Sequence, residues 1–116
     1  MPVAPEVDVR DLPDPLPEGL ILLDVREADA WDAGHIDGAL HIPMMSVPAE
    51  LRSIPTDGEV VVVCAVGARS ARVAAFLQQQ GVDAHNLAGG MVAWARAGRP
   101  ITAASVCDDD TRGNAV

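Results

Sequence analysis

Cys64 stands at a point in the chain where a thiol could act as a nucleophile. It follows four consecutive valines, Val60 to Val63, and four residues separate it from Arg69. Small residues between a strand and a helix allow backbone N–H groups to converge on an anion and to lower the pKa of a thiol. A cysteine after a valine run is also typical of a buried structural residue. The glycine, the arginine and the helix start that follow Cys64 favour a reactive cysteine instead. The loop residues with these N–H groups are Ala65, Val66, Gly67 and Ala68.

The segments around Cys64 are expected to alternate between strands and helices. Short apolar runs indicate buried strands, and the residues after Arg69 place apolar side chains at helical spacing up to Gly81, which favours a helix end. This alternation is typical of an α/β domain with a mostly parallel sheet, in which ligands bind at the carboxyl ends of the strands. We expect strands at 20–25, 39–43, 60–64 and 82–87, helices at 27–34, 69–80 and 89–98, and one or two helical turns at 46–52.

Length and charge exclude several classes of protein. The chain has 116 residues, a length typical of one domain. Its net charge is −9 and all eight basic residues are arginine, which argues against partners such as nucleic acid or an anionic membrane surface. No apolar run approaches the roughly 18 residues of a membrane span, and the first residues lack the pattern of a signal peptide.

The two cysteines, Cys64 and Cys107, form neither a disulfide framework nor a zinc-ligand pattern. We therefore expect no metal, and a reducing, cytoplasmic location. Cys107 lies in a small, polar segment beside three aspartates. We expect residues 1–102 to form the domain and 103–116 a disordered tail. A resolving thiol that pairs with Cys64 is the alternative to an incidental exposed thiol at Cys107.

Three segments together resemble the signatures of single-domain rhodaneses. They are DVREADAWDAGHIDGALHIP, CAVGARS and LAGGMVAWARAGRP, in this order, and the resemblance covers residues 7–101. It implies a three-layer α/β/α domain with a five-stranded parallel sheet and helices on both faces. It also implies that Cys64 takes a sulfane sulfur from a small donor such as thiosulfate, carries it as a persulfide, and passes it to a thiol, cyanide or an acceptor protein, without a cofactor.

The resemblance also implies roles for other residues. The loop after Cys64 would bind the substrate. Asp24 and Arg26 would form a structural ion pair near the floor of the site. His35 would make structural hydrogen bonds, the alternative being a general base. The implied substrate-binding residues are Ala65, Val66, Gly67, Ala68, Arg69 and Ser70.

The length of the loop bears on which anion it binds. By resemblance, the same fold hosts cell-cycle phosphatases and arsenate reductases, in which five residues separate cysteine from arginine, whereas four do so here. The shorter loop favours one sulfur atom over a tetrahedral phosphate. The residue after the cysteine is often basic in active thiosulfate sulfurtransferases, and here it is Ala65. This departure keeps an alternative open, a sulfur carrier or binding module that is loaded by a sulfur-relay protein and has little turnover on thiosulfate.

Overall fold

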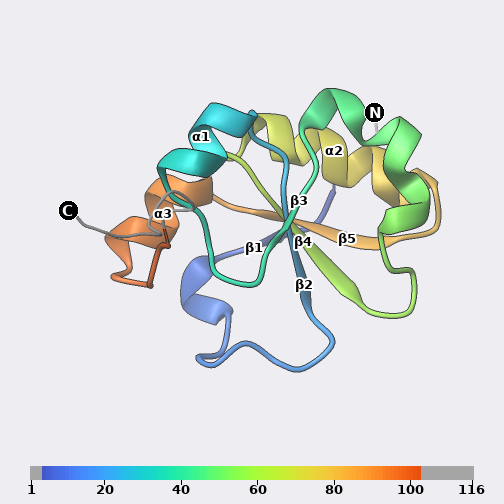
Figure 1. Ribbon diagram of the computed structural model, residues 1–116. Coiled ribbons are helices and arrows are strands. Elements are labelled where there is room, and N and C mark those ends of the chain that lie inside the picture. Colours follow the sequence, from blue (N-terminus) through green and yellow to red (C-terminus); the bar gives the residue numbers. More distant parts are fainter. Residues whose placement is uncertain (1–3, 103–116) are drawn as a thin grey trace.

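The computed structural model describes residues 4–102 (Figure 1). Five parallel strands form one sheet in the order β1-β5-β4-β2-β3, which confirms the expected five-stranded parallel architecture. The expected tail at 103–116, with Cys107, lies outside the described residues. The strands are β1 Glu6–Val7, β2 Ile21–Asp24, β3 Leu40–His41, β4 Glu59–Val63 and β5 Asp83–Leu87.

The three α-helices form where the sequence predicts them, with different ends, whereas the 3₁₀ helix Val9–Asp11 was not predicted. The last helix stops at Arg96 rather than Gly98, and the turns expected at 46–52 form two short 3₁₀ helices. The expected strand at 39–43 is reduced to two residues. The α-helices are α1 Ala28–Ala33, α2 Ala68–Gln79 and α3 Gly90–Arg96, and the 3₁₀ helices are η1 Val9–Asp11, η2 Met44–Ser46 and η3 Pro48–Ser53.

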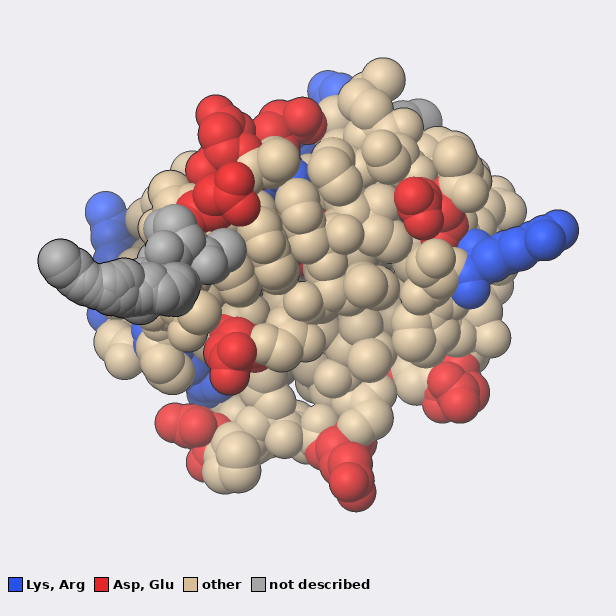
Figure 2. Space-filling view, in the orientation of Figure 1, with Lys and Arg blue, Asp and Glu red and all other residues tan. Residues whose placement is uncertain are grey.

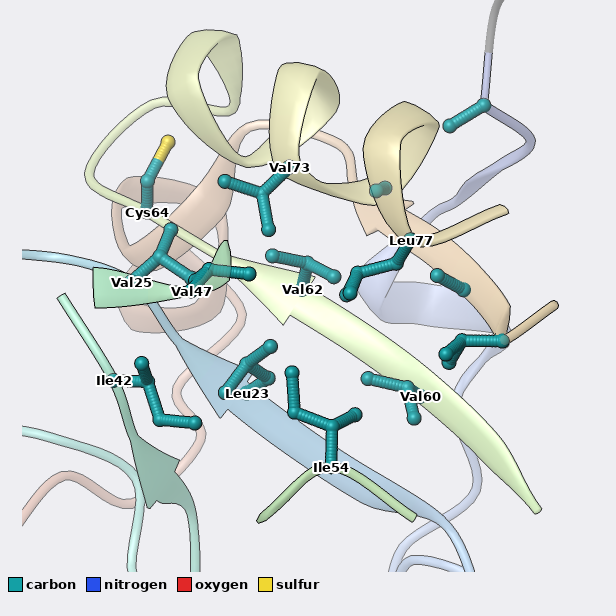
Figure 3. Close-up of a cluster of buried hydrophobic side chains, with 14 residues drawn as sticks. Leu23, Val25, Ile42, Val47, Ile54, Val60, Val62, Cys64, Val73 and Leu77 are labelled. Atoms are coloured by element: carbon teal, nitrogen blue, oxygen red, sulfur yellow. The ribbon is translucent and has the colours of Figure 1, made fainter. Parts of the chain in front are cut away.

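Strand β4 lies between two apolar cores because its side chains alternate between the faces of the sheet. Val60, Val62 and the following Cys64 belong to the core beneath α2, together with Val73 and Leu77. Figure 3 shows these residues, with the sulfur of Cys64 pointing away from the other labelled side chains and toward the turn that enters α2. The reactive position is therefore fixed by a core in which Val60 and Val62 are fully buried.

The opposite face of the sheet is covered by α3 and η1. Val61 and Val63 of β4 pack there with Met91 and Trp94 of α3. Helices thus lie on both faces of the sheet, which gives the expected three layers.

The surface reflects the acidic composition. Figure 2 shows acidic side chains gathered over α1, whose sequence ADAWDA contains two aspartates, and arginines toward the margins of this face. Among the helices that the structure describes, none is long and apolar enough to cross a membrane.

Candidate active site

The loop from β4 to α2 bends around the sulfur of Cys64. β4 ends at Val63 and α2 begins at Ala68, so Cys64 occupies the first loop position. Gly67 adopts φ +103°, in the left-handed region that favours glycine. This conformation turns the Gly67 N–H inward, where it donates to Cys64 Sγ at 3.1 Å. A Cβ at Gly67 would also lie 3.2 Å from the Gly89 nitrogen, so the position is closely packed as well.

Ser70 supplies two further hydrogen bonds to the sulfur. Its N–H donates to Sγ at 3.4 Å and its hydroxyl lies 3.2 Å from Sγ, both from the first turn of α2. Burial raises the pKa of the Cys64 thiol, but hydrogen bonds from the Ser70 side chain and from the N–H groups of Ser70, Gly67 and Val66 outweigh burial, so the pKa lies below its ordinary value. The site therefore favours a thiolate, the nucleophilic form of cysteine.

The first turn of α3 fixes the direction of the peptide groups beside the sulfur. The N–H of Met91 donates to the Cys64 carbonyl at 2.8 Å, and the N–H of Val92 donates to the Ala65 carbonyl at 3.1 Å. Gly90 permits this approach, since a Cβ there would lie 2.2 Å from the Cys64 carbonyl oxygen. With the Ala65 carbonyl held toward α3, the N–H of the next residue, Val66, can face the sulfur.

Asp24 and Arg26 form a buried ion pair at the carboxyl end of β2. The Arg26 guanidinium donates from Nε at 3.0 Å and from Nη2 at 2.8 Å to the two carboxylate oxygens, and Nη2 also donates to the Gly34 carbonyl at 2.7 Å. The pair therefore ties the end of β2 to the end of α1. Charge-assisted bonds to both carboxylate oxygens make this a rigid connection.

His35 and Trp31 pack together beside this ion pair. The two rings stack at 3.5 Å between centroids, and His35 Nδ1 lies 2.9 Å from the Trp31 carbonyl oxygen. The ring of His41 also stacks on Trp31, at 4.5 Å, and its Nε2 lies 2.8 Å from the Arg26 carbonyl oxygen. These contacts support a structural role for His35. His41, which no motif singled out, belongs to the same assembly.

The remaining loop residues differ in their exposure. Only 1% of Cys64 is exposed, whereas the side chain of Val66 is exposed on the rim of the loop and Ala65 is half-buried. Ala68 and Arg69 are exposed at the start of α2, and no ion pair joins Arg69 to another described residue. Ser70 is fully buried, and both its N–H and its hydroxyl lie against the sulfur.

Asn86 is a site residue that the sequence reasoning missed. It lies on β5, is 1% exposed, and its amide contacts Ser70, Gly67 and Glu6 beneath the loop. Alternation along the expected strand places Asn86 on the same face as Val82 and Ala84. A polar residue on that face was the available signal, because buried polar groups are almost always hydrogen-bonded. No three His, Cys, Asp or Glu side chains within residues 4–102 are grouped to hold a metal ion.

The fold is that of a known class of domain. The model of the rhodanese-like domain family matches residues 8–97, so the chain belongs to that family.

Relatives with similar sequences are named sulfurtransferases. A sulfurtransferase of Allochromatium vinosum is 44% identical over 87 residues, which cover 74% of this chain and 81% of the relative. The thiosulfate sulfurtransferase GlpE of Pseudomonas putida is 40% identical over 78 residues, covering 66% and 71%. These names support sulfur transfer as the general activity.

A solved structure shows the same architecture. The crystal structure of a rhodanese-related protein from Thermoplasma volcanium superposes with a TM-score of 0.79 at 28% identity, covering 84% of this chain and 97% of the other.

Proposed function

We propose that the protein is a sulfurtransferase of the cytoplasm that moves a sulfane sulfur from a thiosulfate-type donor to a thiol or cyanide through a persulfide on Cys64. The observation that carries the proposal is the environment of Cys64 Sγ, which is almost fully enclosed and receives hydrogen bonds from Gly67 and Ser70. Hydrogen bonds to a charged group contribute about 1.5–3 kcal/mol each, so the loop can stabilise an anionic sulfur without a metal.

The proposed reaction has two displacement steps. The Cys64 thiolate attacks the outer sulfur of thiosulfate; the sulfur–sulfur bond of the donor breaks, and its electron pair leaves with sulfite. Cys64 then carries a persulfide. An acceptor thiolate or cyanide attacks the outer persulfide sulfur, and the electron pair of the broken bond returns to Sγ. Each step transfers one sulfur atom, so no external oxidant is needed.

The length of the loop favours a single sulfur atom as cargo. Four residues separate Cys64 from Arg69, and the Gly67 N–H already donates to Sγ at 3.1 Å. A loop of this length presents fewer N–H groups than a longer one, which suits one sulfur atom better than the four oxygens of a phosphate. A phosphate-ester hydrolysis assay addresses this point, and turnover of such an ester would contradict the proposal.

Intact mass spectrometry tests the persulfide directly. After incubation with thiosulfate, the protein should gain the mass of one sulfur atom, and a thiol acceptor should remove it. Cys107→Ser should gain the same mass, whereas Cys64→Ser should not. A gain that persists in Cys64→Ser would place the sulfur elsewhere and refute the mechanism.

The rim of the loop favours a second candidate, a sulfur carrier that a partner protein loads. Val66 is 62% exposed and the half-buried residue beside it is Ala65, so the two residues that follow the nucleophile present apolar side chains, and Arg69 is the nearest basic residue after them in the chain. An apolar entrance suits a protein surface or a neutral persulfide better than a dianion. In the mass experiment, sulfur gained from a low-molecular-weight persulfide or a persulfidated protein but never from thiosulfate would favour this candidate.

A further inference from the structure

The amide of Asn86 has only one orientation that satisfies its neighbours. Its Nδ2 donates to the Glu6 carboxylate at 3.0 Å and to the Gly67 carbonyl at 3.1 Å. Both partners are acceptors only, so the NH₂ end of the amide must face them. The opposite end, Oδ1, consequently faces Ser70.

The hydroxyl of Ser70 lies between two acceptors and has one proton to donate. Its Oγ is 2.5 Å from Asn86 Oδ1 and 3.2 Å from Cys64 Sγ. Ser70 is 0% exposed and Asn86 is 1% exposed, so bulk water cannot supply a missing donor. Whichever acceptor receives the proton, the other one loses that hydrogen bond.

We propose that Asn86 is a positioning residue that competes with Cys64 Sγ for the Ser70 hydroxyl proton, so that this hydroxyl turns between the two acceptors as the charge on the sulfur changes. When the sulfur is a thiol, the hydroxyl donates to Asn86 Oδ1. When the sulfur is a thiolate, the hydroxyl donates to Sγ, since a charged acceptor forms the stronger bond.

The turn of the hydroxyl has a consequence for sulfur transfer, and this part of the inference rests on the proposed function. In the persulfide, the negative charge lies on the outer sulfur and Sγ is a weak acceptor, so the hydroxyl donates to Asn86 again. As the acceptor removes the outer sulfur, the electron pair returns to Sγ and the hydroxyl turns back to it. Ser70 would thus stabilise the departing thiolate, while Asn86 holds the hydroxyl in place between turnovers.

A set of double mutants tests the competition through the pKa of the Cys64 thiol. The pKa is taken from the pH dependence of alkylation by iodoacetamide, in a Cys107→Ser background that leaves one thiol. Asn86→Leu removes the competing acceptor, so the pKa should fall by about half a unit, which is about threefold more thiolate below the pKa. General loosening of the loop would raise the pKa instead, because it weakens the donors to the sulfur.

Ser70→Ala provides the second arm. Its effect on the pKa should be larger in the Asn86→Leu background, where the hydroxyl belongs to the sulfur alone, than in the parent. In the Asn86→Asp background, the carboxylate keeps the hydrogen bond from the Ser70 hydroxyl, so Ser70→Ala should change the pKa of Cys64 by close to zero. Equal effects in all three backgrounds would overturn the proposal. Should one Asn86 variant not fold, the other still gives a comparison with the parent.

Two charged side chains lie beside Ser70 and Asn86. A control variant separates the effect of charge on the pKa from the competition for the hydroxyl proton. The Glu6 carboxylate accepts a hydrogen bond from Asn86, and Arg69 precedes Ser70 in α2. Glu6→Gln keeps an acceptor for Asn86 and removes one negative charge, so it should lower the pKa less than Asn86→Leu. An equal or larger fall would assign the effect to charge and contradict the competition. No sulfur donor is present in these measurements, so their outcome is independent of the mass experiment on persulfide formation.

Discussion

Replacing Ala65 by arginine should improve the use of thiosulfate. Ala65 follows the nucleophile, is half-buried, and has its carbonyl fixed by the N–H of Val92 at 3.1 Å. A longer side chain can therefore extend from the rim while the backbone around the sulfur stays in place. The new guanidinium would attract the sulfonate end of the donor as its outer sulfur enters the loop.

The size of this effect follows from the position at the rim. Two unit charges 4 Å apart near a protein surface attract by about 4 kcal/mol at an effective dielectric constant of 20. Desolvation and the ordering of a flexible side chain cancel most of this energy. A net gain of about 1 kcal/mol remains, which corresponds to about a fivefold higher kcat/KM.

Steady-state kinetics with two donors check the reasoning. Ala65→Arg should raise kcat/KM for thiosulfate about fivefold at low salt, and the gain should shrink as salt rises because ions screen the attraction. A neutral persulfide donor should be used almost equally by both proteins. Ala65→Met is the matched control, since it adds length without charge. An equal gain with both donors, or with Ala65→Met, would show that this position acts through loop geometry and refute the electrostatic reasoning.

Three further predictions concern the nucleophile, its supporting loop and its charge. Cys64→Ser should abolish sulfur transfer while the free energy of unfolding changes little, measured by thiocyanate formation and urea unfolding; residual turnover above a trace would exclude the persulfide. Gly90→Ala should destabilise the fold by about 2–4 kcal/mol, because its Cβ would meet the Cys64 carbonyl oxygen at 2.2 Å and φ is +55°; Gly98→Ala, with φ +76° and open space around its Cβ, should cost about 1 kcal/mol, and similar losses would contradict the packing argument. The pKa of Cys64 is lowered by folding, so the unfolded chain binds more protons than the folded chain between that lower pKa and the ordinary value of 9.0. Across this pH window, urea unfolding should show that the free energy of unfolding of the parent rises with pH relative to that of Cys64→Ser. Parallel pH profiles of the two proteins would show that folding does not favour the thiolate.

The elements that position the nucleophile were predictable because their patterns are local. The valine run before Cys64 and the helical spacing after Arg69 each specify one element, and β4 and α2 form there. Strand β1 was not predicted as a segment. It has two residues, Glu6 and Val7, and exists through pairing with Asn86 and Leu87 of β5, a contact that no local pattern can indicate.

Within the site, too, features that depend on a local pattern were predictable, whereas contacts between distant segments were not. The inward N–H of Gly67 follows from a glycine between a strand and a helix, a pattern visible in the sequence. The contact between Ser70 and Asn86 spans 16 positions and depends on how α2 packs over β5, so it required the structure. The resemblance implies that Ser70 binds substrate, which stays a prediction; the structure adds that its hydroxyl lies 3.2 Å from the Cys64 sulfur.

The placement of Cys64 one residue beyond a strand buried on both faces also makes it a reporter of local opening. Amides in the middle of β4, such as those of Val61 and Val62, are expected to exchange their hydrogens only when the whole domain unfolds. The sulfur is covered by a short loop and the first turn of α2, whose opening breaks the hydrogen bonds from Gly67 and Ser70 but leaves the strands of the sheet paired. Comparing the rate at which a bulky thiol reagent modifies Cys64 with the exchange rate of the β4 amides would therefore separate the energy of opening the loop from the energy of unfolding the domain.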